Sequence, residues 1–118
     1  MARILIIDDD INIRTILGLS LEDAGHEVVL AAEGREGIQK HRATPVAVIV
    51  TDLFMPGQEG VETIRQLRKE FPQVKIIAMS GEVAANPMLK VASKLGADKI
   101  LHKPFLVEEL LKAIEEVL

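Results

Sequence analysis

The sequence predicts an α/β protein with a doubly wound, five-stranded parallel sheet, and two observations support this prediction. Five short runs are rich in Val, Ile and Leu, and segments of helical length and period separate them. The runs cover residues 4–7, 27–31, 46–51, 74–79 and 99–102. The first, third and fourth are almost continuously apolar, as expected of strands that are buried on both faces. Alternating strands and helices form a parallel sheet with right-handed crossovers and helices on both faces.

The segments between the strands carry apolar residues at spacings of three and four, which predicts five helices. Asp10 is expected to cap a helix that begins at Ile11. The segment 34–43 has the weakest helical pattern, because Gly34 and Gly37 each cost about 1 kcal/mol relative to Ala inside a helix. The remaining helices are expected over residues 61–71, 86–96 and 107–118.

Composition limits the possible functions of this chain of 118 residues, which we interpret as one domain over residues 1–118. Cysteine is absent, which excludes disulfides, thiolate metal sites and cysteine nucleophiles. A net charge of −4 argues against direct binding of nucleic acid, and no apolar run has the length of a membrane span. We therefore expect a cytoplasmic protein. The sequence leaves open whether it acts alone or as the N-terminal module of a longer protein.

Polar residues follow four of the five expected strands. Asp8, Asp9 and Asp10 follow the first, Asp52 the third, Ser80 the fourth and Lys103 the fifth. Because function gathers at the carboxyl ends of the strands in such sheets, we expect these side chains to converge.

The charges of this group predict its chemistry. Two carboxylates about 5 Å apart repel by about 3 kcal/mol at an effective dielectric constant near 20, and a hard divalent cation such as Mg²⁺ offsets that repulsion. Asp52 then remains an anionic nucleophile, and Lys103 neutralises charge on an incoming phosphoryl group. Ser80 is placed to hydrogen-bond one phosphoryl oxygen. The pattern predicts a phosphoryl-transfer site whose acceptor is the protein's own carboxylate.

Taken together, these residues resemble the response-regulator receiver domains of two-component signalling, including the chemotaxis regulators, over residues 3–118. The resemblance implies a flavodoxin-like sheet of order 2-1-3-4-5. It also implies that Asp52 accepts a phosphoryl group from a histidine kinase or phosphotransfer protein, with Ser80 as the switch hydroxyl. Lys103, in the motif Lys-Pro-Phe, is the charge partner of that group and precedes a cis peptide bond. The Mg²⁺ ligands implied are Asp8, Asp9, Asp52 and the backbone carbonyl of Phe54.

The resemblance further implies a switch surface made by the fourth helix, the fifth strand and the fifth helix. Its residues here are Lys90, Lys94, Lys99 and Ile100. This surface controls a partner or output domain, and it makes a homodimer plausible. Ile100 stands where many receivers carry Tyr or Phe, so a switch in this chain must work without an aromatic ring. A receiver accepts and loses a phosphoryl group and is not otherwise an enzyme.

Three other functions fit these residues less well. A haloacid-dehalogenase-like phosphatase would use Asp8 and Asp10, but Asn12 stands where that family has Thr, and there is no room for a cap domain. A flavodoxin-type electron carrier lacks its phosphate loop here, and no Trp or Tyr is present to cover a flavin. A receiver-like scaffold that takes no phosphate is disfavoured by the intact acidic, hydroxyl and lysine set. The three histidines, His26, His41 and His102, show no ligand spacing and are expected at the surface.

Overall fold

The computed structural model describes residues 1–53, 59–81 and 92–118. Its centre is a parallel sheet of five strands in the order β2-β1-β3-β4-β5, which confirms the predicted fold class and strand order. The strands are β1 (Arg3–Ile7), β2 (Glu27–Ala31), β3 (Val48–Asp52), β4 (Lys75–Ser80) and β5 (Lys99–His102). From β1 the chain passes to β2 on one side and then to β3 on the other, and this reversal creates the switch point at which ligands bind in sheets of this kind.

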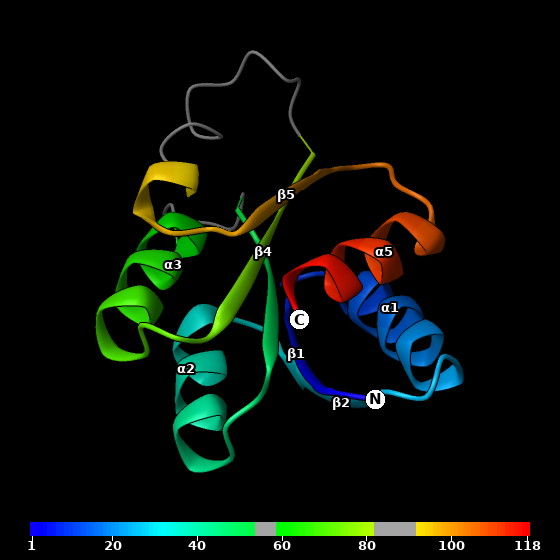
Figure 1. Cartoon of the computed structure of the whole chain (residues 1–118), viewed down its shortest axis with the longest axis horizontal. Helices are drawn as coiled ribbons and strands as arrows, with labels where there is room; N and C mark the ends of the chain where they lie inside the picture. The colour runs from blue at the N-terminus through cyan, green and yellow to red at the C-terminus, as the bar shows by residue number, and fades with distance from the viewer. Residues whose placement is uncertain (54–58, 82–91) are drawn as a thin grey trace.

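Helices cover both faces of the sheet (Figure 1). α1 (Ile11–Asp23) and α5 (Val107–Val117) lie on one face, and α2 (Gly34–Ala43) and α3 (Glu59–Glu70) lie on the other. Residues 92–95 are helical, where the end of the fourth expected helix falls, and the preceding part of that helix lies outside the described residues. The helix predicted over 34–43 is confirmed with its bounds unchanged.

The core forms two layers because successive side chains of a strand point to opposite faces. Ile4 and Ile6 pack with the buried side chains of α1 and α5, whereas Leu5 and Ile7 pack with those of α2 and α3. All four side chains are 0% exposed. Burial on both faces explains why the first, third and fourth runs are almost continuously apolar.

Glycine permits the close approach of α2 to β1. A Cβ atom at Gly37 would lie 2.4 Å from Cδ1 of Ile7, which is much closer than a normal contact. The residue that weakens the helical pattern of 34–43 therefore allows this helix to rest on the sheet. The tertiary contact offsets the low helix propensity of glycine.

Polar contacts fasten α2 to the outer strand β2. Lys40 Nζ donates a hydrogen bond to the carbonyl oxygen of Leu30 at 2.5 Å and forms an ion pair with Glu36 Oε2 at 3.0 Å. Glu36 Oε1 accepts the backbone N–H of Ala32 at 2.7 Å. The end of β2 is thus fixed by side chains of the helix that follows it.

His41 is buried, so the expectation of a surface position was wrong for this histidine. The residue is 4% exposed, and its Nδ1 accepts the backbone N–H of Val46 at 3.0 Å. The ring meets that of Phe71 at 89°, with 4.5 Å between centroids. Burial lowers the pKa of His41, while the nearby charge of Glu70 acts in the opposite direction. His102 is exposed, as expected.

Within residues 1–53, 59–81 and 92–118, no helix combines the length and apolar character needed to cross a membrane.

Candidate functional site

The sheet brings the predicted site residues together at its carboxyl end. Asp8 directly follows β1, Asp52 ends β3, Ser80 ends β4 and Lys103 directly follows β5. Asp8 and Ser80 are fully buried and Asp52 is 6% exposed. These polar side chains are therefore held inside the protein, where the charges of Asp8 and Asp52 are weakly screened.

Lys103 bridges two of the carboxylates. Its Nζ lies 3.1 Å from Asp8 Oδ2 and 3.3 Å from Asp52 Oδ2. Its backbone N–H donates to the carbonyl oxygen of Ser80 at 2.6 Å, and the bond to Pro104 is cis, as expected. Burial lowers the pKa of Lys103, but the charges of Asp52 and Asp8 outweigh that effect and raise the pKa above its usual value. The ammonium group is therefore charged at neutral pH.

Asp8, Asp9 and Asp52 fit a divalent cation. One oxygen of each carboxylate lies within 4.8 Å of the others, and Asp9 is the exposed member of the group. The three carboxylates exceed the ammonium of Lys103 by two negative charges, which a divalent cation balances. Oxygen donors of this kind, with water completing the shell, are the ligands of Mg²⁺.

Asp8 is held through all four of its polar atoms. Its backbone N–H donates to the Ala31 carbonyl oxygen at 3.1 Å, and its Oδ1 accepts the backbone N–H of Asp10 at 2.9 Å. Its Oδ2 faces Lys103, and its carbonyl oxygen accepts a hydrogen bond from Arg14 Nη1 at 2.7 Å. The sequence analysis missed Arg14. Helical side chains tilt toward the N-terminus of their helix, so a basic residue in the first turn of α1 was a usable signal.

Gly60 is a second residue that the sequence analysis missed. A Cβ atom there would lie 2.3 Å from the carbonyl oxygen of Asp52 and 2.6 Å from Cα of Leu53. These are backbone atoms that cannot move aside as a flexible side chain does. Glycine at this position therefore lets the start of α3 pack directly against the strand end that carries Asp52.

Asp10 has a different role from the other acidic residues of this loop. Its backbone has extended geometry at the N-terminus of α1, and Oδ1 accepts the backbone N–H groups of Asn12 at 2.8 Å and Ile13 at 3.4 Å. The expected helix cap is confirmed. With its side chain used in this way, Asp10 is poorly placed to act as the acid of a phosphatase.

The expected switch surface is only partly described. Lys94 is exposed, Lys99 forms an ion pair with Glu116 of α5 at 2.9 Å, and Ile100 is partly buried against the core. Lys90 and Phe54 lie outside the described residues.

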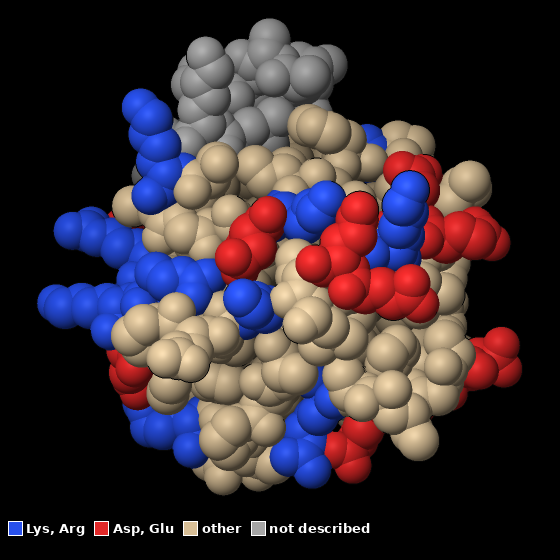
Figure 2. All heavy atoms as spheres, in the orientation of Figure 1, with Lys and Arg blue, Asp and Glu red and all other residues tan. Residues whose placement is uncertain are grey.

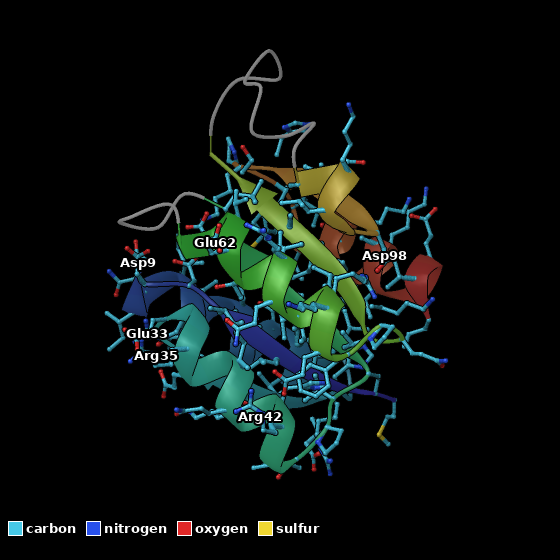
Figure 3. All side chains as sticks on the ribbon, turned by 90° about the vertical axis from the view of Figure 1, so that its left-hand side faces the viewer. Asp9, Glu33, Arg35, Arg42, Glu62 and Asp98 are labelled. Carbon is cyan, nitrogen blue, oxygen red and sulfur yellow. The ribbon has the colours of Figure 1, made fainter. Side chains whose placement is uncertain are left out.

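Two surface hollows differ in character. A polar one of about 710 Å³ lies between α2 and α3, where Figure 3 labels Glu33, Arg35, Arg42 and Glu62. An apolar one of about 420 Å³ adjoins Lys103. Its lining residues are Ile13, Ile16, Leu17, Gly81, Lys103, Pro104 and Phe105. Only the second hollow touches a residue of the acidic site.

Comparison with known proteins identifies the family. The sequence profile of the response regulator receiver domain matches residues 4–115. The chain is 34% identical to the response regulator MprA of Mycolicibacterium vanbaalenii, covering 98% of this chain and 50% of MprA. It is 32% identical to the chemotaxis protein CheY of Listeria monocytogenes, covering 98% of both chains. The structure of CheY4 from Vibrio cholerae superposes with a TM-score of 0.91 at 37% identity, covering 100% of this chain and 99% of that one.

The chain belongs to the receiver-domain family of two-component response regulators. It spans about half the length of MprA and nearly the whole of CheY from Listeria monocytogenes. Members of the family act as phosphoacceptor switches that receive a phosphoryl group from histidine kinases, and they generally use Mg²⁺ at an acidic cluster such as that of Asp8, Asp9 and Asp52. The phosphatase alternative is not favoured.

Proposed function

We propose that Asp52 accepts a phosphoryl group from a phosphohistidine of a kinase or phosphotransfer protein. The observation that supports this most directly is the position of Lys103, whose ammonium lies between the Asp8 and Asp52 carboxylates at adjoining strand ends. Asp8, Asp9, Asp52 and the backbone carbonyl of Phe54 are the proposed Mg²⁺ ligands. We propose the cytoplasm as the compartment, because a histidine kinase is phosphorylated there from ATP.

In the proposed reaction, an oxygen of the Asp52 carboxylate forms a bond to phosphorus while the bond between phosphorus and the donor nitrogen breaks. The imidazole, protonated on its other ring nitrogen, leaves with the electron pair of that bond as neutral histidine. When bound, Mg²⁺ supplies positive charge that stabilises the phosphoryl oxygens. Lys103 already faces Asp52 Oδ2 at 3.3 Å, so it can neutralise a phosphoryl oxygen with little movement.

Ser80 is the proposed switch hydroxyl, because it ends the strand next to that of Asp52 and is fully buried. A phosphoryl group on Asp52 offers it a charged acceptor, and a shift of its hydroxyl would move the end of β4. In the sheet register, Ala78 of β4 lies opposite Ile100 of β5. Ile100 is thus placed to report that shift by repacking an aliphatic side chain.

The proposed output surface comprises the end of the fourth helix, β5 and α5, with Lys90, Lys94, Lys99 and Ile100. In Figure 2, most basic side chains gather on the α3 side of this view and most acidic ones on the α5 and α1 side. A partner or a second copy of the chain that docks here would meet both signs of charge. Phosphorylation-linked dimerisation through this surface is part of the proposal.

An apolar surface beside the site supports a protein donor. The hollow next to Lys103 has an apolar lining, in which Ile16 is 59% exposed. Leu106, which follows the lining residue Phe105 in the sequence, is 64% exposed. Exposed apolar side chains around a reactive group are typical of protein interfaces. We therefore propose that the phosphodonor is a protein and that its apolar surface covers this hollow during transfer.

Intact-protein mass spectrometry after incubation with acetyl phosphate tests the proposal. The wild type should gain one phosphoryl group in the presence of Mg²⁺, and Asp52→Asn should gain none. Asp23→Asn is the matched control, because it removes the same carboxylate chemistry from an exposed position at the end of α1.

Each other outcome assigns a different function. Failure of the wild type to gain mass contradicts the proposal and favours the scaffold interpretation. A gain that persists in Asp52→Asn but is lost in Asp8→Asn favours a phosphatase-like reaction at Asp8.

A further inference from the structure

We propose that Arg14 is a positioning residue for the Mg²⁺ site, where it holds Asp9 in the geometry that binds the metal. This inference rests on the proposed function, because it concerns the metal on which phosphoryl transfer depends. Arg14 belongs to α1 and is half-buried, and its Nη1 donates to the Asp8 carbonyl oxygen at 2.7 Å. It is not itself a metal ligand.

Hydrogen bonds hold the two peptide groups on either side of Asp9. A peptide group is planar, so fixing its oxygen also fixes the Cα atom of the residue that follows. Arg14 fixes the group between Asp8 and Asp9 through the carbonyl oxygen of Asp8. The group between Asp9 and Asp10 is fixed through the Asp10 N–H, which donates to Asp8 Oδ1 at 2.9 Å. The backbone of Asp9 is therefore held from both sides.

The Asp9 side chain itself has little other support. It is exposed, and within the described ranges no hydrogen bond or ion pair holds its carboxylate. Its direction toward Asp8 and Asp52 thus depends on the backbone that carries it. Groups that orient the ligands of a metal commonly change its affinity by a factor of ten or more.

The positive charge of Arg14 and its positioning role change the affinity for Mg²⁺ in opposite directions, which makes the proposal testable. Arg14 is a cation near a divalent-cation site, so as a charge alone it weakens binding, and its removal would strengthen binding. As a positioning residue it strengthens binding, and its removal would weaken it. The sign of the change therefore distinguishes the two roles.

The test is isothermal titration calorimetry of the unphosphorylated domain with MgCl₂. We expect Arg14→Met to raise the Mg²⁺ dissociation constant about tenfold. Arg14→Lys keeps an N–H donor and should recover most of the affinity. Arg35→Met is the charge control, because Arg35 is exposed and no hydrogen bond or ion pair joins it to another described residue. Leu21→Val, at the far end of α1, controls for lower stability alone and should leave the affinity unchanged.

Unchanged or tighter binding by Arg14→Met, with a normal wild type, overturns the positioning role and leaves the proposed function standing. Weaker binding by Leu21→Val to the same extent as Arg14→Met also overturns it, because loss of stability would then be the cause. Failure of the wild type to bind Mg²⁺ overturns both this inference and the metal-dependent function.

Discussion

Arg68 and Asp98 form an ion pair, with Nη2 of the arginine 3.0 Å from Oδ2 of the aspartate. The same carboxylate oxygen accepts the backbone N–H of Ile76 at 2.8 Å. The pair therefore joins α3 to the start of β4 and to the segment that leads into β5. In Figure 3, Asp98 and Asp9 lie at opposite ends of the molecule, so this contact is remote from the acidic site.

Replacing Arg68 should destabilise the protein strongly. Its guanidinium also donates to the carbonyl oxygens of three residues, which are Pro72, Val74 and Gly96. Arg68→Met leaves these acceptors without their donor, and we expect the free energy of unfolding to fall by about 2 to 3 kcal/mol. Urea denaturation measures this loss. Arg65→Met is the control, since that side chain is 67% exposed and its ion pair with Glu62 spans 3.6 Å. An equal effect of both variants would contradict the prediction.

Replacing each of two helical glycines by alanine should have different effects on the stability of the protein. Gly60→Ala places a Cβ atom against the backbone of Asp52, and we expect it to lower the free energy of unfolding by about 1 to 3 kcal/mol. Gly18→Ala meets only the side chains of Leu30 and Val28, at 3.4 Å and beyond. The higher helix propensity of alanine should make that variant as stable as the wild type or up to about 1 kcal/mol more stable. Thermal unfolding of both variants would refute this idea if Gly60→Ala were the more stable one.

Mg²⁺ should reverse the stability order of the wild type and Asp9→Asn. Without divalent cations, the substitution relieves repulsion among three carboxylates within 4.8 Å of one another, so the Tm should rise by a few degrees. With saturating Mg²⁺, binding to the folded state stabilises the wild type more than the variant. Melting curves with EDTA and with excess MgCl₂ test both halves. Asp23→Asn should show neither effect. An Asp9→Asn variant whose Tm in EDTA is no higher than that of the wild type would argue against electrostatic repulsion in the site.

His41 should make stability depend on pH. Burial lowers the pKa of His41 in the folded state, so the unfolded state takes up a proton first as the pH falls below about 6.5. The wild type should therefore lose stability relative to His41→Gln as the pH falls from about 8. The difference should level off below the folded-state pKa. Nearby Glu70 reduces the effect, since its charge favours the protonated ring. Urea denaturation at several pH values measures it, and a constant difference between the two proteins would count against it.

The sequence predicted those features that depend on local pattern or on topology. The apolar runs predicted five strands, and the order of the elements brought Asp8, Asp52 and Lys103 to one end of the sheet. The helix over 34–43 was also predicted, although its two glycines disfavour a helix. The reason for Gly37 appeared only in the structure, where α2 lies against Ile7 of β1.

The features that were missed depend on packing between distant segments. Histidine is a polar residue type, and no nearby sequence pattern indicates that His41 is buried. In the structure its ring packs against Phe71 and accepts a hydrogen bond from Val46. Gly60 is required by the backbone of Asp52, which lies on another element. No periodicity within a single helix reveals such contacts. Arg14 had a weak local signal, its place in the first turn after the acidic loop.

The contact between Lys40 and Leu30 has a consequence for how this protein behaves at high concentration. β2 is an edge strand, and a free carbonyl on an edge strand invites strand addition by another chain. The Lys40 ammonium donates a hydrogen bond to the outward carbonyl oxygen of Leu30 and puts a positive charge beside it. An incoming strand would have to displace that charge before it could pair. The side chain that fastens α2 therefore also protects this margin of the sheet from aggregation.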